Sequence, residues 1–275
     1  MGSWKIPNRI EREYARALNA LARQVGAALG NDPDPYAAVR RLRQIAQHPP
    51  WREFCDALAL KMTTHTQTRI NGTWRTAAQR AGRGSDIYMA IEKELSNNGI
   101  YDAFINQVRE NAALIKSFPI GEAEELTGYI QSETMKGRRA SDIAGELRKF
   151  FDDRSQAKMN LIARTETSKT QTALTRARAE RLNLPWYVWR TSDDSRVRSS
   201  HDHMDGVLIR WDDPPRPEAL VGEEKPPPPY HAGNIYNCRC YPEPVVDIGF
   251  LTFPMRVYHD GRIQKMTRSH FERVA

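Results

Sequence analysis

Thiol and imidazole side chains gather in the last third of the chain, where they could bind a metal ion. Zinc prefers four nitrogen or sulfur ligands arranged in a tetrahedron. The side chains that could supply them are Cys238 and Cys240, in the stretch NIYNCRCYPEPV, with His201 and either His203 or His231. This set is chemically sufficient for one zinc ion.

The spacing of the two cysteines argues against zinc. Paired cysteines of structural zinc sites are usually separated by about two to four residues, whereas only Arg239 lies between Cys238 and Cys240. Alternate residues of a strand share a face, so the sequence favours two small, buried, apolar side chains on one face and Arg239 on the other. The prediction is therefore no cofactor, with zinc as the alternative.

A second set of polar residues could perform acid–base chemistry. It consists of Arg164, Glu166, Asp194, Arg198 and His201. A histidine beside acidic groups can activate water, as in a nuclease, but no complete set of nucleophile, base and orienting group is visible. The favoured interpretation is a structural network in which Arg198 pairs with Glu166 or Asp194 through two hydrogen bonds.

Basic residues form two clusters, and either could hold phosphates through charge alone. The first comprises Lys158, Arg164, Lys169, Arg176, Arg178 and Arg181, and the second comprises Arg256, Arg262, Lys265, Arg268 and Arg273. The first cluster is best interpreted as a solvated helix face. The second could contact nucleic acid, stay solvated, or belong to an arm that docks on a partner, with a hairpin turn at Asp260-Gly261.

The composition is that of a globular protein that remains where it is made. The chain has 275 residues, 27% of them charged, and a formal net charge of +7. No apolar run approaches the roughly 18 residues of a membrane span, so no membrane association is expected. Its 3 cysteines are an odd number, and the close pair has poor geometry for a relaxed disulfide.

Helices are expected to position these side chains through the first two thirds of the chain. Apolar residues recur every three or four positions over residues 10–29, a helical period. Shorter helices are predicted after the stretch NDPDP and from Trp51, and a long helix is predicted over residues 155–184, before Pro185. Ser85 and Ser141 each precede an apolar-periodic run, so both are predicted to be N-caps.

After Pro185 the sequence pattern changes from helical to that of strands and loops. The stretch WYVWRTSDDSRVRSS resembles a strand, and residues 214–229 contain seven prolines, which predicts an extended loop. The predicted class is α+β. The predicted domains are a helical region at 1–150, a domain with the long helix and a small sheet at 151–250, and a basic C-terminal arm at 251–275.

Three stretches in this order resemble the phage Mu F-like family of phage head morphogenesis proteins, also called minor head or minor capsid proteins. They are LIARTET, DSRVRSSHDHMDG and NCRC, and the resemblance covers about residues 140–246. The family pattern falls on Arg164, Thr165, Glu166, Asp194, Arg198, His201, Gly206, Cys238, Arg239 and Cys240. Family members often carry a His-Pro pair just before the last motif, whereas His231 has no proline after it.

The resemblance implies a structural, non-enzymatic protein of a tailed bacteriophage. It would join the procapsid near the portal in the host cytoplasm and remain inside the head of the virion. Its partners would be portal and capsid or scaffold proteins, with double-stranded DNA as a further contact during packaging or ejection. The alternatives are a metal-dependent nuclease or transferase that uses Arg164, Glu166, His201 and the cysteine pair, or a sequence-independent DNA-binding module.

Overall fold

The computed structural model describes residues 4–274. Contacts divide the chain into two compact units. Unit 1 holds residues up to Pro7, His65–Ile105 and the chain from Thr165 onward. Unit 2 holds Asn8–Thr64 and Asn106–Arg164. These units do not coincide with the three consecutive ranges predicted from the sequence, because long helices contribute residues to both.

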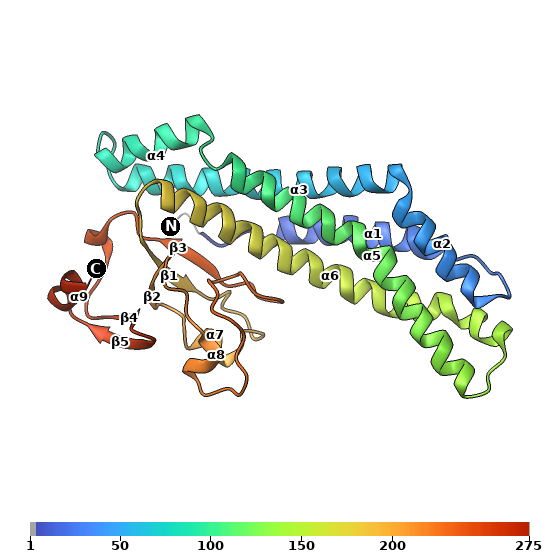
Figure 1. Ribbon diagram of the computed structural model, residues 1–275. Helices are drawn as coiled ribbons and strands as arrows, with labels where there is room; N and C mark the ends of the chain where they lie inside the picture. The colour runs from blue at the N-terminus through green and yellow to red at the C-terminus, as the bar shows by residue number, and fades with distance from the viewer. Residues whose placement is uncertain (1–3, 275) are drawn as a thin grey trace. The chain divides into compact units, whose positions relative to one another are not determined.

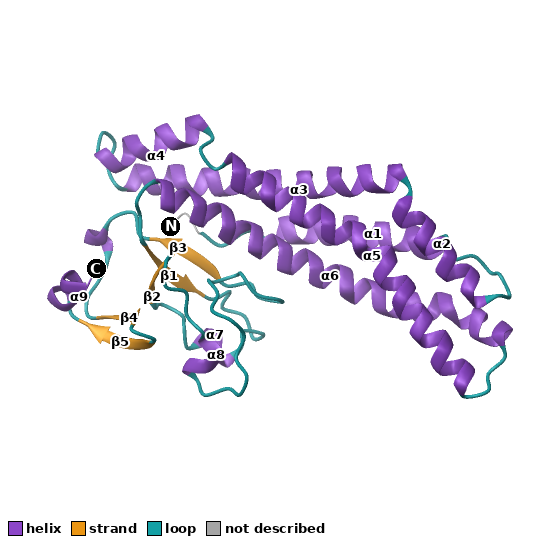
Figure 2. Ribbon diagram, viewed as in Figure 1, coloured by secondary structure: helices purple, strands orange, loops and turns teal. Residues whose placement is uncertain are grey.

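The α+β class is confirmed (Figure 1). Figure 2 shows helices and a small group of strands, and the described strands all lie between Trp186 and Met266. The long elements are α1 (Asn8–Ala27), α2 (Pro35–Gln47), α3 (Pro49–Arg80), α4 (Asp86–Asn97), α5 (Tyr101–Met135) and α6 (Ala140–Arg181). Within residues 4–274, no helix is both long enough and apolar enough to cross a bilayer.

Unit 2 is a bundle of helices around one apolar core. Helix α1 places Tyr14, Leu18, Leu21 and Val25 on one buried face, as its three- and four-residue spacing predicts. Each of the three aliphatic side chains contributes about 1.5–3 kcal/mol by leaving water. The predicted N-terminal helix is confirmed.

Of the two predicted N-caps, one is confirmed and one is wrong. The hydroxyl of Ser85 accepts a hydrogen bond of 3.3 Å from the backbone N–H of Tyr88 at the start of α4. Helix α6 instead begins at Ala140, so Ser141 lies inside the first turn and is exposed. The first turn is closed by the carbonyl of Arg139, which accepts from the N–H of Ile143 at 3.1 Å.

Unit 1 contains a five-stranded sheet in the order β3-β1-β2-β4-β5. Its elements are β1 (Trp186–Arg190), α7 (Ser199–Asp202), β2 (Leu208–Arg210), α8 (Pro217–Leu220), β3 (Tyr241–Pro244), a 3-10 turn (Ile248–Phe250), β4 (Met255–His259), β5 (Arg262–Met266) and α9 (Arg268–Val274). Strands β2 and β4 are parallel, and the other neighbouring pairs are antiparallel.

Strand β1 is buried on both faces. Tyr187 and Trp189 belong to the larger core of unit 1. Trp186 and Val188, which point the other way along the strand, belong to a smaller core that includes Phe271 of α9. The predicted strand therefore exists, but it ends at Arg190 and does not continue through the following polar residues.

The predicted separate C-terminal arm is wrong, because its residues complete the sheet. Strand β4 pairs with β2 through Val257 and Leu208. The predicted hairpin turn is present between β4 and β5, with left-handed φ angles of 50° at Asp260 and 73° at Gly261. Val257 and Phe271 are both fully buried, so the tail is part of the fold of unit 1.

Candidate functional site

Three predicted site residues meet in unit 1, and we call them the His–Cys–Cys cluster (His201, Cys238 and Cys240). The Nδ1 atom of His201 lies 3.4 Å from Sγ of Cys238 and 3.5 Å from Sγ of Cys240. The three ligand atoms all lie within 4.8 Å of one another. Each side chain is at most 3% exposed, so the cluster is closed to bulk solvent.

The segment that connects the antiparallel strands β1 and β2 positions His201. Helix α7 carries this histidine, and Gly206 follows with a left-handed φ of 74°. The N–H of Gly206 donates to the carbonyl of Trp189 at 2.9 Å, which fixes the end of this segment against β1. Glycine suits this position because other residues adopt such a φ only with strain.

The two cysteines are buried as predicted, but they do not lie in a strand. Strand β3 begins only at Tyr241. Before it, the N–H of Cys238 donates to the carbonyl of Ile235 at 3.3 Å, and Asn237 has a left-handed φ of 60°. The N–H of Cys240 then donates to Sγ of Cys238 at 3.3 Å. This turn, and not strand alternation, directs both sulfurs toward His201.

Tyr230 and Glu218 form a second layer behind the histidine. Nε2 of His201 lies 2.9 Å from the hydroxyl oxygen of Tyr230. That hydroxyl donates to the carboxylate of Glu218, with its oxygens at 2.7 and 2.8 Å. An ionised carboxylate only accepts, and a tyrosine hydroxyl has one hydrogen. The tyrosine oxygen must therefore accept from Nε2–H, which leaves the Nδ1 lone pair facing the two sulfurs.

The pKa values of these buried groups shift in opposite directions. A hydrogen bond from Cys240 lowers the pKa of the Cys238 thiol, although burial opposes this shift. The pKa of the Cys240 thiol is raised because it donates to Cys238 and because it is buried. Burial, followed by the bond to Glu218, raises the pKa of Tyr230. Of the two thiols, Cys238 is therefore the more acidic.

His231 does not join the cluster, so the predicted zinc set that included it needs correction. Its Nδ1 lies 3.1 Å from the hydroxyl of Tyr187, and its ring packs edge-on against Trp211 with centroids 5.3 Å apart. Burial lowers its pKa to about 4, so it is neutral near pH 7. The other alternative, His203, is exposed at the end of α7.

The predicted pairing of Arg198 with Glu166 or Asp194 is wrong. Arg198 stands at the N-cap of α7 with 41% of its side chain exposed. One of its nitrogens donates to the carbonyl of Tyr236 at 2.9 Å, and another lies 3.9 Å from Glu218. Arg198 therefore links the start of α7 to the cysteine loop and to the second layer behind His201.

The two acidic motif residues have other partners. Glu166 is buried and lies 3.4 Å from the ammonium of Lys169. Asp194 lies 3.2 Å from Arg196 and 3.8 Å from Arg239. Burial alone would raise the pKa of Asp194, but hydrogen bonds from Arg196, followed by the charges of Arg196 and Arg239, lower it. These contacts hold the loop after β1 to the turn that carries the cysteines.

The Ala-Arg-Thr-Glu motif is divided between the units. Arg164 lies 3.5 Å from Glu11 within unit 2. Thr165 belongs to unit 1, where its hydroxyl accepts from the backbone N–H of Asn237 at 3.0 Å. Thr165 therefore contacts the turn that carries Cys238 and Cys240, whereas Arg164 pairs within unit 2.

Several basic residues have structural partners that the sequence did not reveal. Arg178 is 1% exposed and pairs with Glu94, so the first basic cluster is not entirely a solvated face. Arg256 donates to the carbonyls of His203, at 3.0 Å, and Asp205. These arginines hold unit 1 together and leave fewer charges for a polyanion.

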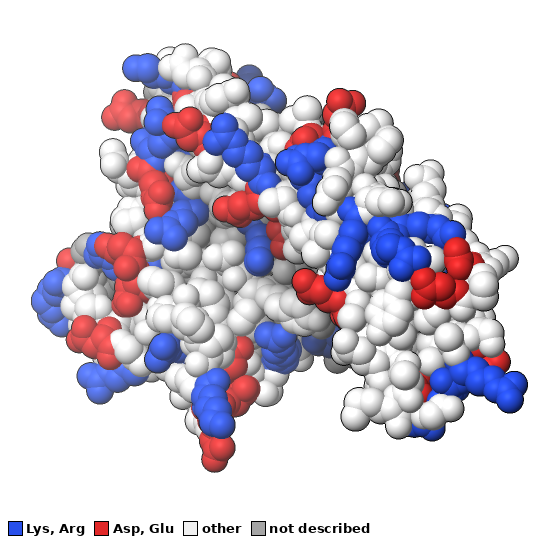
Figure 3. Space-filling model, turned by 45° about the vertical axis from the view of Figure 1, so that its right-hand side comes forward, with Lys and Arg blue, Asp and Glu red and all other residues white. Residues whose placement is uncertain are grey.

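Besides Arg268, three basic residues of the C-terminal part are exposed, and we call these three the tail basic residues (Arg262, Lys265 and Arg273). Arg268 is also exposed, but it donates to the carbonyl of Leu251 at 3.2 Å and lies over the ring of Phe253. On the face of the molecule in Figure 3, acidic and basic side chains are interspersed.

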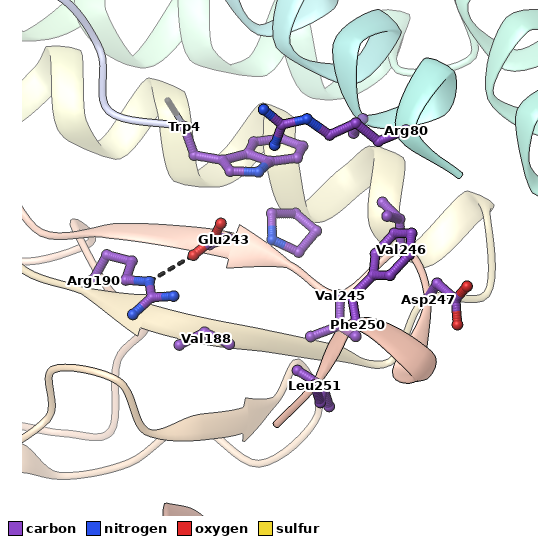
Figure 4. Close-up of a pocket in the computed structure, with 12 residues that line it drawn as sticks. Trp4, Arg80, Val188, Arg190, Glu243, Val245, Val246, Asp247, Phe250 and Leu251 are labelled. Atoms are coloured by element: carbon purple, nitrogen blue, oxygen red, sulfur yellow. Dashed lines mark hydrogen bonds and ion pairs between the residues drawn. The ribbon is translucent and has the colours of Figure 1, made fainter. Parts of the chain in front are cut away.

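A pocket of about 470 Å³ in unit 1 was not foreseen from the sequence. Figure 4 shows Trp4 on one side of it and Val188 of β1 on another. Arg190 donates to Glu243 at 2.5 Å across the neighbouring strands. Its other lining residues include Phe250. Residues far apart in the chain form it, which is why no local pattern could predict it.

Comparison with known proteins identifies the segment that carries the cluster. Residues 125–242 match the phage Mu protein F like family. This segment is similar to the members of that family. It contains the His–Cys–Cys cluster and overlaps the range of about 140–246 predicted from the three motifs, so the predicted resemblance is confirmed.

An uncharacterized protein of Haemophilus influenzae is 31% identical to the chain over 137 residues, which is 50% of this chain. The chain spans 28% of that protein's length. No solved structure matches the chain. The similarity to the phage Mu protein F like family therefore rests on residues 125–242.

Proposed function

We propose that this protein is a minor head protein of a tailed bacteriophage and acts by its position in the particle, without catalytic turnover. The observation that carries the proposal is the match of residues 125–242 to the phage Mu protein F like family. Its partners are the portal and the capsid or scaffold proteins. It joins the procapsid in the host cytoplasm and stays inside the head of the virion.

The burial of His201, and of Glu218 behind it, supports a structural role over a nuclease or transferase. A general acid or base must come within about 3 Å of the proton that it transfers, or act through one water. His201 is 2% exposed, and Glu218 is 6% exposed. A nucleic acid or protein substrate has no direct path to these groups, and their hydrogen bonds already link α7, α8 and the cysteine turn.

The tail basic residues supply a weaker contact to DNA. They lie on or after β5, next to the sheet, and are exposed. Such charges bind phosphates without reading sequence. A patch of this size fits transient contact with packaged DNA and does not require a dedicated DNA-binding module.

Coexpression with the neighbouring head proteins tests the proposal. The full chain with an affinity tag is expressed together with the portal and capsid proteins of the same phage, and particles are separated by sedimentation. We expect the chain to sediment with portal-containing particles, while an unrelated tagged protein of similar charge stays at the top. Failure to associate with portal, capsid or particles would contradict the proposal.

A parallel assay distinguishes the enzymatic alternative. The purified chain is incubated with supercoiled plasmid and divalent metal ions, and nicking is measured. We expect no cleavage above that of a His201→Gln control prepared in the same way. Cleavage by the wild type that the control loses would favour the nuclease.

A further inference from the structure

We propose that the His–Cys–Cys cluster binds one zinc ion, with Nδ1 of His201 and the two Sγ atoms of Cys238 and Cys240 as ligands and a water in the fourth position. The inference concerns the fold of unit 1, so it stands apart from the proposed role in the phage head. It also reverses the expectation from the cysteine spacing.

The distances fit a shared ion. Zinc lies about 2.3 Å from sulfur and about 2.0–2.1 Å from nitrogen, so a tetrahedral site places the two kinds of ligand about 3.6 Å apart. The observed separations from His201 Nδ1 are 3.4 and 3.5 Å. A hydrogen bond between thiol and imidazole could explain one such contact. The Nδ1 atom has only one lone pair, so two contacts of nearly the same length are better satisfied by an ion between all three atoms.

The second layer prepares the histidine as a ligand. Histidines that bind zinc usually donate their other ring N–H to a carboxylate, carbonyl or water, which fixes the tautomer and the ring orientation. Here the Nε2–H of His201 donates to the hydroxyl oxygen of Tyr230 at 2.9 Å, and that hydroxyl donates to the carboxylate of Glu218 at 2.7 Å. This chain keeps the Nδ1 lone pair free and aimed at the sulfurs.

The turn before β3 explains how two cysteines separated by a single residue can bind the same zinc ion. Two cysteines separated by one residue would point the same way from an extended strand, but their sulfurs would not converge on one point. The left-handed conformation of Asn237 and the contact between the Cys240 N–H and Sγ of Cys238 fold the backbone around the site. Both sulfurs therefore reach the same imidazole nitrogen.

The site is sealed rather than open to large substrates. Among the described His, Cys, Asp and Glu residues, no fourth side chain joins the three ligand atoms. The ring of Trp189 packs edge-on against His201 with centroids 5.7 Å apart, and Trp189 is fully buried. A small ligand such as water can complete the coordination, and the role that follows is structural.

A zinc ion here would join parts of unit 1 that contain little regular structure. His201 comes from the one-turn helix α7, and the cysteines follow a proline-rich loop whose only described helix is α8. Metal binding to ligands that converge only in the folded state adds its free energy to folding. The ion would therefore stabilise the cysteine loop against α7.

Metal analysis of the purified full chain tests the site. The protein is prepared without chelators from zinc-supplemented cells, and zinc per chain is measured by mass spectrometry. We expect about one zinc per chain in the wild type, loss of zinc in His201→Gln, and full retention in His231→Gln and Cys55→Ser, which change a buried histidine and a buried cysteine outside the cluster. Replacement by cobalt should give the visible absorption of tetrahedral thiolate coordination.

A milder variant keeps the test valid if the ligand variants misfold. Tyr230→Phe removes the hydroxyl that orients His201 and keeps the ring in the core. Loss of such a second-layer partner typically weakens metal affinity about 10- to 100-fold, and we expect that weakening in a competition with a zinc chelator. Folded wild type that contains no zinc and takes up neither zinc nor cobalt would overturn the proposal, as would equal zinc affinity of Tyr230→Phe and wild type.

Discussion

Replacement of Phe271 by alanine tests whether the C-terminal segment belongs to the core of unit 1. Phe271 is fully buried, and its ring centroid lies 5.1 Å from that of Trp186 and 5.4 Å from that of Phe253. A cavity of this kind costs about 3–5 kcal/mol, a large part of the roughly 5–15 kcal/mol that stabilises a typical domain. We expect unit 1 to unfold at a much lower urea concentration.

The matched control is Arg273→Ala, which changes an exposed residue of the same helix. A surface change of this kind usually shifts the free energy of unfolding by less than about 0.5 kcal/mol. Unfolding is followed by tryptophan fluorescence and circular dichroism. If Phe271→Ala fails to fold, Phe271→Leu gives a smaller, measurable loss. Equal urea midpoints for wild type, both Phe271 variants and the control would refute the placement of α9 against β1.

Three further predictions follow from local geometry and charge. Gly233→Ala should destabilise unit 1 more than Gly206→Ala. Both glycines have left-handed φ angles, but only at Gly233 would the new methyl group meet the carbonyl oxygen of Cys240, at 2.6 Å. Thermal denaturation should therefore give Gly233→Ala the lower melting temperature. His231 has a folded pKa of about 4, below its usual value of 6.5, so the unfolded state binds the proton first and stability should fall by about 3 kcal/mol as the pH drops from 6.5 to 4. His231→Gln should flatten that pH dependence, and an unchanged slope would contradict it. Replacing the three tail basic residues with glutamine should make the plot of log affinity for duplex DNA against log salt concentration less steep, by up to about 2.7 in slope. Replacing the exposed residues Arg9, Arg23 and Lys61 with glutamine should leave that slope unchanged.

Local patterns predicted the local parts of the fold. The apolar spacing of α1, the cap at Ser85 and the turn at Asp260-Gly261 depend on neighbouring residues only, and all three are present. Ser141 failed as a cap because the helix begins at Ala140, two residues before the start that this cap would give, a shift that the sequence pattern does not resolve.

The sequence predicted which residues form the cluster, but it did not predict which side chains they contact. The motifs named His201 and both cysteines, but Tyr230 and Glu218 were missed because they lie in a proline-rich stretch that resembles a featureless loop. Their meeting with His201 depends on how α7 and α8 fold against the sheet. Pro217 was the one signal in the sequence that could have indicated helix α8, because proline favours the first position of a helix.

The pairing of Arg198 could not be predicted for the same reason. Charge complementarity allowed Glu166 or Asp194 as partners, but the backbone carbonyl of Tyr236 is the group that Arg198 reaches. Backbone acceptors carry no signature in the sequence, so side-chain types alone favour ion pairs over contacts of this kind.

The content of purified phage heads tests the central claim most directly. Heads are isolated by two successive gradients, and this chain and the portal protein are quantified in the same fractions by mass spectrometry. A structural minor head protein should be present in a fixed ratio to the portal across fractions and after nuclease treatment and a salt wash. A chain that is absent from heads, or that washes away in salt while the heads stay intact, would contradict the account.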